Sequence, residues 1–241
     1  MIPNAAPRRT WAILFIALSL VLCSALPAQQ LSEAEVIRRA DAAVASRFDN
    51  VLRFTATEHY IIYRGSDESH PAAELTALDT YKKGAGKTYT VLSESGSRLL
   101  IHFGLKPLLA RETEVNLPGN VEKSWFISAN YTMHLKPGGI QKIDGRDCYG
   151  LAISPKHNAP NMIVGTMWVD AQDGTMVRVE GVASQSPSAL TDVPRMMRKY
   201  TKIDGYSMSQ HARAESSSFL YGRTVVTIDY SNYNLQVRTK K

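Results

Sequence analysis

The sequence predicts a mainly-β protein, in which a strongly curved antiparallel sheet of about eleven strands has helices over its open side. Three observations lead to this fold class. Alternation of polar and apolar residues, interrupted by turn residues, runs through most of the chain after residue 50. Strand follows strand with short connections, which antiparallel pairing allows and parallel pairing does not. The strands that can be read in detail are apolar on one face only, as is the first helix.

The first 28 of the 241 residues have the layout of a secretory signal peptide. Arg8 and Arg9 precede an uncharged run at 11–22, which is shorter than the roughly 20 residues of a membrane span. Cleavage after Ala28 leaves residues 29–241 as a single domain. Because the signal contains two arginines and no acid, its removal lowers the net charge from +6 to +4.

The protein is therefore expected to be exported. A lipoprotein cleavage box has a small residue before its cysteine, but Leu22 precedes Cys23, so anchoring to the outer membrane through Cys23 is not expected. Loss of Cys23 leaves Cys148 alone, which excludes a disulfide within the mature chain. With 44% hydrophobic and 21% charged residues, the composition excludes a disordered protein.

The first element of the mature chain is predicted to be a helix at 32–48. Ser32 and Glu35 form a capping box, and Leu31 before it can pack on Val36. Apolar side chains then recur at helical spacing on one face, including Val36, Ala40, Val44 and Phe48. We expect this face to lie on the open side of the sheet, as a lid or wall of a cavity, although a permanent core plug is the alternative.

Strands are predicted at 51–64, 75–83, 87–93, 98–103, 124–135, 146–154, 162–170, 175–183, 195–203, 206–217 and 223–235. A short helix is predicted at 107–114, where Pro107 suits the first helical position. Asp204-Gly205 is a strong signal for a two-residue hairpin. In the hairpin at Asp173-Gly174, alternation places Trp168 opposite Val177 on a face that we expect to point inward, and a slip of one residue would reverse this assignment.

Motifs for cofactors and metals fail on their spacing. Residues 84–88, Gly-Ala-Gly-Lys-Thr, lack the first glycine of a phosphate-binding loop and precede a strand, so a hairpin turn is expected. Residues 170–174 lack the ligands of a calcium loop, and the six histidines have no zinc spacing. The sequence predicts no catalytic residue, metal site or cofactor, although a Ser/His/Asp set assembled in space remains open.

Seven methionines lie in or beside predicted strands, at 133, 162, 167, 176, 196, 197 and 208. They either fill the core or line an adaptable cavity for lipid, because methionine fits variable apolar shapes. The basic residues are dispersed apart from two groups, Arg195, Arg198 and Lys199 in one and the C-terminal tail in the other, and are expected to contact water. A mildly basic exported protein favours anionic lipid or envelope polymer over nucleic acid.

From Asn130 onward, an ordered series of segments resembles the exported outer-membrane lipoprotein-sorting proteins of the LolA/LolB-like group. It covers about half of the mature chain. The segments are Asn130-Tyr131, Gly145-Arg146-Asp147-Cys148-Tyr149, Leu151-Ala152-Ile153-Ser154-Pro155-Lys156, Gly165-Thr166-Met167-Trp168-Val169-Asp170, Asp173-Gly174, Arg178-Val179-Glu180-Gly181, Pro187-Ser188, Tyr200-Thr201-Lys202-Ile203-Asp204-Gly205-Tyr206 and Gly222-Arg223. Members often carry Trp after the Pro-Ser pair, where this chain has Ala189-Leu190, and Pro near Ser207-Met208-Ser209.

The resemblance implies a periplasmic half-open barrel whose hydrophobic cavity receives acyl chains without chemistry on them. The implied partners are a lipid or acylated lipoprotein and an envelope membrane protein, with a monomer preferred and no nucleic acid. An envelope protein–protein interaction or stress-sensor module on the same fold is the alternative, and an exported hydrolase comes third. We expect the cavity to be lined by Phe54, Tyr60, Ile62, Tyr131, Met133, Trp168, Val177, Val226, Ile228 and Tyr230.

Overall fold

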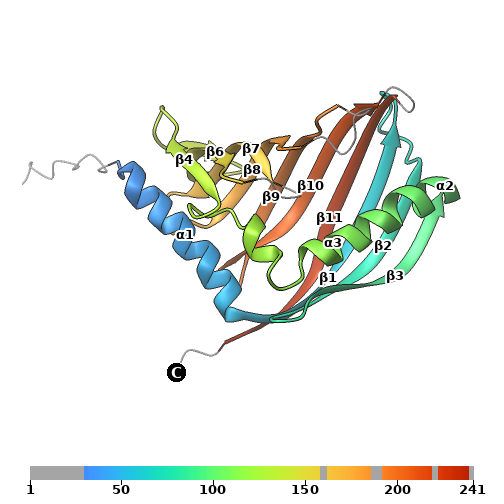
Figure 1. The fold of residues 1–241 in the computed structure, drawn as a ribbon, viewed down its shortest axis with the longest axis horizontal. Helices are drawn as coiled ribbons and strands as arrows, with labels where there is room; N and C mark the ends of the chain where they lie inside the picture. The colour runs from blue at the N-terminus through green and yellow to red at the C-terminus, as the bar shows by residue number, and fades with distance from the viewer. Residues whose placement is uncertain (1–29, 158–161, 186–191, 219–221, 239–241) are drawn as a thin grey trace, which may run out of the picture. The chain divides into compact units, whose positions relative to one another are not determined.

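The fold is one strongly curved antiparallel sheet that does not close on itself (Figure 1). The computed structural model describes residues 30–157, 162–185, 192–218 and 222–238. The chain divides into two units, Met1–Gln30 and Leu31–Lys241, and the helices and strands of the described residues lie in the second. The predicted signal peptide and Cys23 lie outside the described residues. The described part has eleven strands in the order β3-β2-β1-β11-β10-β9-β8-β7-β6-β4, with β5 paired to β6, which confirms the predicted fold class.

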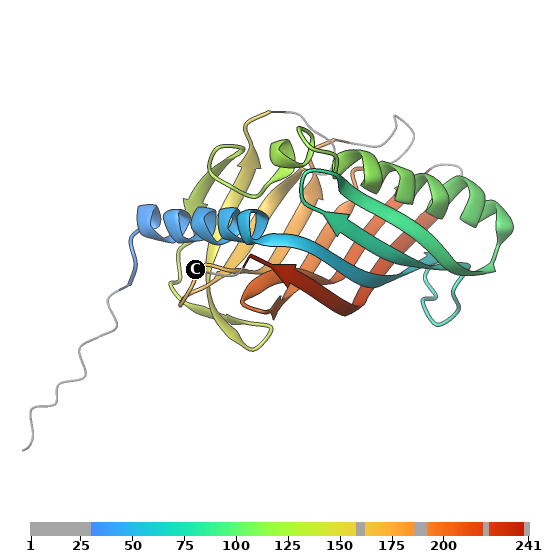
Figure 2. The same ribbon diagram turned by 90° about the horizontal axis from the view of Figure 1, so that it is seen from below.

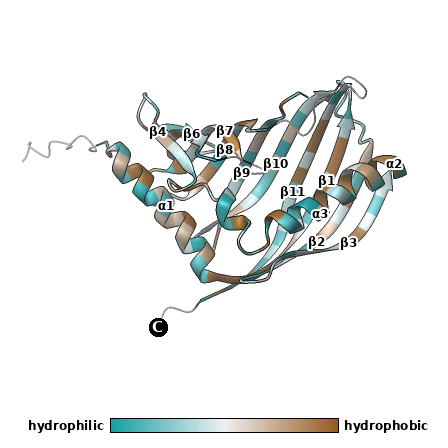
Figure 3. Cartoon of the chain, in the orientation of Figure 1, coloured by the Kyte–Doolittle hydropathy of each residue, from teal (hydrophilic) through white to brown (hydrophobic). Residues whose placement is uncertain are grey.

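The strands are β1 (Val51–Arg64), β2 (Ala73–Lys82), β3 (Gly86–Gly96), β4 (Tyr131–Leu135), β5 (Gln141–Ile143), β6 (Arg146–Pro155), β7 (Ile163–Asp170), β8 (Met176–Ala183), β9 (Arg195–Ile203), β10 (Tyr206–Ser218) and β11 (Gly222–Val237). The helices are α1 (Glu33–Asn50), α2 (Arg98–Leu100), the π-helix η1 (Ile101–Leu105), α3 (Lys106–Val115) and the 3₁₀ helix η2 (Val121–Ser124). Bands of hydrophobic and hydrophilic residues alternate along the strands in Figure 3, as their period of two requires.

Helix α1 begins as predicted, with Ser32 as its N-cap accepting a hydrogen bond from the Glu35 amide at 3.3 Å. The Glu35 carboxylate does not complete the capping box, because it binds Arg38 and Arg39 on the next turn. The helix packs against β1, β4, β8 and β10. Its apolar face is buried at Val36, Ala40 and Val44, and this defines the helix-covered side as the inner face of the sheet.

Residues 98–103 are helical, so the predicted strand there is wrong. Ser97 caps the helix by accepting from the Leu100 amide, and α2, η1 and α3 follow one another without a break along the inner face (Figures 1 and 2). Ile101, Leu105 and Leu109 recur every four residues and are all buried, which is a helical period. Pro107 has no amide hydrogen to donate, and the wider π turn precedes it, so the predicted helix at 107–114 is confirmed within a longer one.

The predicted strand at 124–135 is shorter in the structure. Only Tyr131–Leu135 pairs with β6, whereas Val121–Ser124 forms a 3₁₀ helix and the residues between are turns. The Asn130 side chain holds these turns in place by donating to the carbonyls of Glu122 and Trp125 at 2.7 and 3.0 Å. The short strand β5, which pairs with β6, was not predicted.

A β-bulge reverses the predicted faces of the β7–β8 hairpin. Val169 pairs with Met176, but Trp168 pairs with Arg178, so Val177 is an extra residue and not the partner of Trp168. Trp168 and Val177 lie with Cys148 in a small cluster on the outer face. Met167, Val169 and Val179 instead pack beneath α1. The inward assignment of Trp168 and Val177 is therefore wrong, because a bulge changes the alternation on which it was based.

The inner face carries two separate apolar cores. The first, beneath α1, joins residues of β4 and β6 to β9, with Tyr131, Leu151 and Met167 at its centre. The second, beneath η1 and α3, joins β1, β2, β10 and β11, with Tyr60, Leu75 and Leu105 fully buried. The strands that connect these cores form the floor of the candidate site.

Candidate functional site

The structure contains a cavity of about 280 Å³ between the inner face of the sheet and the helices that cover it. Helices α1, α3 and η2, with the Trp125-Phe126 segment, supply the cover, and strands β9, β10 and β11 supply most of the floor. Its volume is close to the lower end of the roughly 300–1,000 Å³ of small-molecule sites. The cavity adjoins both apolar cores, since Val44 and Tyr200 of the first and Ala212 and Ile228 of the second line it.

Much of the lining is apolar and adaptable. Phe48 of α1 stacks on Trp125, with ring centroids 4.1 Å apart, and closes one side. Three methionines border the cavity, Met176 and Met196 with side chains on the inner face and Met197 with its side chain on the outer face. The other four of the predicted set, at 133, 162, 167 and 208, are buried core residues. Flexible thioether side chains can follow the shape of different apolar ligands.

The cavity is also lined by charged residues that the sequence analysis did not predict there. Arg47, in the last turn of α1, lies over the Phe48 ring at 4.7 Å, and its Nε atom is buried with no hydrogen-bond partner among the described residues. Burial lowers the pKa of the Arg47 guanidinium, and the charge of Arg198 contributes to this lowering. The indole Nε1 of Trp125 is likewise buried without a partner in this part of the chain.

Lys87 lies in a buried ionic group beside the cavity. Its ammonium is 3.2 Å from Glu58 Oε1 and 2.5 Å from Asp79 Oδ2, and the Tyr60 hydroxyl donates to Glu58. Burial raises the pKa of Asp79 to about 7, and the charge of Glu58 adds to this rise against the lowering by Lys87. Burial also acts on Glu58, but Lys87 and Tyr60 hold the pKa of that carboxyl below its ordinary value. Lys87 is therefore neutralised by protein carboxylates.

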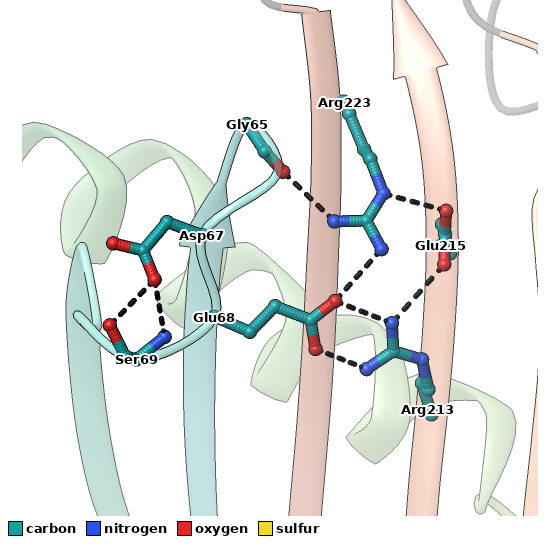
Figure 4. A network of polar contacts seen from close by, with 7 residues as sticks. All are labelled: Gly65, Asp67, Glu68, Ser69, Arg213, Glu215 and Arg223. Carbon is teal, nitrogen blue, oxygen red and sulfur yellow. Dashed lines mark hydrogen bonds and ion pairs between the residues drawn. The ribbon is translucent and has the colours of Figure 1, made fainter.

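Arg213 of β10 borders the cavity, but its side chain alternates with that of Ala212 and lies on the outer face, where it is neutralised (Figure 4). Its guanidinium forms two hydrogen bonds with Glu68, at 2.6 and 2.8 Å, and one with Glu215 at 3.2 Å. Arg223 binds the same two carboxylates and the Gly65 carbonyl. This network fixes the connection between β1 and β2 against β10 and β11.

The predicted lining residues divide among several environments. Val226, Ile228 and Tyr230 line the cavity, as do Val44 and Phe48 of the predicted wall helix. Tyr60 and Ile62 lie in the second core, Tyr131 and Met133 in the first together with Val36 and Ala40, and Phe54 in a third cluster near the end of α1. Trp168 and Val177 lie on the outer face and are absent from the lining.

Sequence reasoning missed Tyr200 of β9 and the arginines Arg47 and Arg198, although it named Met196 as a residue of the core or of an adaptable cavity. Arg198 was grouped with Arg195 and Lys199 as surface charge, although alternation along the strand separates it from Lys199. A signal was present, because Met196, Arg198 and Tyr200 are spaced by two and Tyr200 is buried. Arg47 follows the apolar positions Val36, Ala40 and Val44 at a helical spacing, which was a second signal.

A Ser/His/Asp group occurs at Asp67, Ser69 and His70, in the connection between β1 and β2. The Ser69 hydroxyl is 2.6 Å from the Asp67 carboxylate, and both contact the same nitrogen, Nδ1 of His70, at 2.9 Å. In a hydrolytic triad the serine and the acid contact opposite ring nitrogens. The His70 side chain is 85% exposed and lies outside any cleft, so the group has the geometry of a turn.

Within the described residues, no three metal-binding side chains gather as potential ligands. Cys148 is buried and free, and burial raises the pKa of its thiol to about 11, so it stays protonated and unreactive at neutral pH. The residues at 84–88 form the turn and first residues of β3, as the sequence predicted.

No helix among the residues that the structure describes combines the length and the apolar character needed to cross a membrane.

No family model and no curated protein matches the chain. Solved structures to which it is similar include a DUF1329 family protein from Desulfovibrio piger, with TM-score 0.42 and 14% identity over 85% of this chain and 95% of that one. A LolA superfamily protein from Nitrosomonas europaea has TM-score 0.45 and 12% identity over 87% and 96%. An outer membrane lipoprotein-sorting protein domain from Vibrio parahaemolyticus has TM-score 0.46 and 14% identity over 87% and 94%.

Proposed function

We propose that the protein is a periplasmic carrier that holds the acyl part of a lipid or lipoprotein in the cavity and does no chemistry on it. The observation that carries this proposal is the cavity of about 280 Å³ under the helices, with Phe48, Trp125, Met176 and Met196 in its wall. An apolar ligand that fills it would gain roughly 25 cal/mol for each Å² of apolar surface removed from water. The resemblance of residues 130–223 to lipoprotein-sorting proteins supports the same class of ligand.

Export, single-domain organisation and maturation near Gln29 belong to the same proposal. Residues 1–28 would direct export, 29–241 would form the carrier, and Cys23 would leave unacylated with the signal peptide. Helix α1 would serve as a wall through Val44 and Phe48, since both line the cavity while Val36 and Ala40 hold the helix in the core. An envelope membrane protein would supply or receive the ligand.

The test is recovery and binding of lipid. Mass spectrometry of organic extracts from the exported protein should identify a co-purifying amphiphile, and the fluorescent fatty acid cis-parinaric acid should bind the emptied protein in a one-to-one ratio. Ala212→Phe should abolish both, because Ala212 is 8% exposed on the cavity floor and a ring there would occupy the ligand's volume. Ala45→Phe, at an exposed position of α1, is the matched control.

Equal binding by Ala212→Phe and the wild type would place the lipid elsewhere and remove the carrier proposal.

A further inference from the structure

We infer that the cavity holds an anion subsite, in which Arg47 and Arg198 bind the carboxylate or phosphate head group of a single-chain amphiphile whose tail lies along the apolar lining. This inference rests on the proposed carrier function and narrows its ligand class. It follows from the pairing of the charges in the cavity, from the position of Arg198 in the sheet, and from the kind of polar atoms left unpaired.

Four basic residues border the cavity, and two of them are already neutralised, Lys87 on the inner face and Arg213 on the outer face. Lys87 is bound by Glu58 and Asp79, and Arg213 by Glu68 and Glu215. In the part of the chain that the structure describes, Arg47 and Arg198 have no ion pair. Glu112 of α3 is the acidic residue of the lining, and it forms no ion pair with either arginine. The lining thus retains an excess of positive charge.

Arg198 occupies a position that the strands on either side of it fill with apolar residues. Successive cross-strand partners on the inner face run through Leu75, Tyr60, Ile228, Ala212, Arg198, Val179, Met167, Leu151 and Leu135. Beyond Leu75 the row ends at Glu94 of the edge strand β3, which is paired with Lys106. Arg198 is the charged residue inside the row and stands where the second core gives way to the first. Arg198 is half-buried, and although burial lowers its pKa, Tyr230, Tyr200 and Glu112 raise it, so the guanidinium stays charged. A partly desolvated charge without an ion pair is costly, so its presence in this row points to a ligand that supplies the opposite charge.

The unpaired polar atoms at the cavity are hydrogen-bond donors. Arg47 Nε and Trp125 Nε1 are buried without acceptors among the described residues, and both side chains line the cavity. A carboxylate or phosphate has only acceptor oxygens in its ionised form and matches the planar guanidinium. The helix C-terminus and the Phe48 ring hold the Arg47 charge in place, but neither provides an acceptor in the plane of its N–H groups.

This chemistry separates two kinds of lipid cargo. The acyl chains of a lipoprotein end in neutral esters and an amide, which would leave both arginines unpaired inside the cavity. A free fatty acid or a lysophospholipid with a terminal phosphate would pair them while its chain contacts Met176, Met196 and Val226. The structure therefore favours a single-chain anionic lipid.

The experiment compares cis-parinaric acid with its methyl ester, which has the same chain and no charge. The wild type should bind the acid at least 10-fold more tightly. Arg47→Met and Arg198→Met should each remove this preference while leaving ester binding within about 3-fold. Arg198→Lys should keep most of the preference. Arg111→Met removes a solvent-exposed arginine from α3 and is the control.

A second readout excludes a purely structural role. Removal of an unpaired buried charge should leave the thermal midpoint of the ligand-free protein unchanged or raise it, whereas loss of a structural contact would lower it. Competition by lysophosphatidic acid, palmitic acid and monopalmitoylglycerol then separates phosphate from carboxylate. Displacement of the probe by lysophosphatidic acid and palmitic acid, but not by monopalmitoylglycerol, supports the subsite. Whichever of the two acids competes at the lower concentration identifies the head group as phosphate or carboxylate.

Equal binding of acid and ester by the wild type would overturn the anion subsite while leaving the carrier proposal in place. Failure of both probes, and of all three competitors, would overturn both.

Discussion

At the scale of single residues, the buried carboxyl of Asp79 should make the free energy of unfolding depend on pH. Folding raises its pKa from 3.8 to about 7, chiefly by burial, so the folded protein holds this proton more tightly than the unfolded chain. The resulting stabilisation is complete below pH 3.8 and is lost as pH rises through about 7. At about 1.4 kcal/mol per pKa unit the full rise would be worth about 4 kcal/mol, and sharing of the proton with Glu58 reduces this.

Asp79→Asn should remove this contribution. Urea unfolding at pH 5 and pH 8 should show that the wild type loses more stability than the variant over this interval. Asp67→Asn is a control of opposite sign, because Ser69 and His70 lower the pKa of Asp67 to about 2 and its effect appears only in acid. If wild type and Asp79→Asn kept the same slope between pH 5 and 8, another group would hold the proton.

Gly150 tests the assignment of Trp168 to the outer face. A Cβ atom at this position would lie 2.7 Å from Cζ3 of the Trp168 ring, so Gly150→Ala must displace a packed indole. We expect a loss of roughly 1–3 kcal/mol in urea unfolding, typical of overpacking. Binding of cis-parinaric acid should not change, since this contact is on the opposite side of the sheet from the cavity. Weakened binding at unchanged stability would contradict the assignment.

At the scale of elements, the sequence was informative wherever one periodicity extended over a whole segment. Helix α1, the long strands β1, β10 and β11, and the Asp204-Gly205 turn were predicted within a few residues, and Asp204 and Gly205 take the positive φ values such a turn requires. The predicted and observed counts of eleven strands agree because two errors cancel. The predicted strand at 98–103 is helical, and strand β5 was not predicted. A short apolar run fits either structure, and tertiary burial of Ile101 and Leu105 decides between them.

The candidate site was predicted less well than the fold because it depends on contacts between distant segments. Val226, Ile228 and Tyr230 could be placed from alternation alone, and Val44 and Phe48 from the helical stripe. A single-residue bulge at Val177 was enough to reverse one hairpin, because faces alternate with every residue. Lys87 has carboxylate partners and Arg198 has no ion pair because of which strands lie next to each other in the sheet. No local sequence pattern contains that information.

Helix α3 is the element whose movement should control loading. Leu109 is its one buried residue, and its first turn contacts β3 through the Lys106–Glu94 ion pair at 2.9 Å. The turns before it are anchored by Ile101 and Leu105 of η1, so the part of α3 beyond Leu109 is the part free of buried contacts. Helix α1 is held along its whole length by Val36, Ala40 and Val44, and Asp41 accepts two hydrogen bonds from Ser128. A ligand enters more readily past the element that costs less to displace.

Cysteines at the two ends of the ion pair, Glu94→Cys with Lys106→Cys, can be joined by a cleavable bismaleimide. We expect loading of cis-parinaric acid to slow at least 10-fold when linked and to recover on cleavage. Arg38→Cys with Ala42→Cys, joined within α1, is the control, and Cys148 is buried and should not react. Unchanged loading by the linked α3 variant would return the gating role to α1, the helix that its sequence pattern predicts to be a lid or wall.

At the scale of the whole molecule, the cavity separates the two cores of the inner face, and a bound ligand should couple them. Residues of both cores line it, and the connecting row of the sheet is interrupted by Arg198. At a free ligand concentration of 100 times Kd, binding should stabilise the fold by about 2.7 kcal/mol. If the ligand spans the cavity, hydrogen exchange should slow in both β1–β2 and β6–β7, although these hairpins lie far apart in the strand order. Arg111→Met should behave as the wild type. Protection confined to one hairpin pair would show that the ligand contacts a single core, and the shared cavity would then not be its binding site.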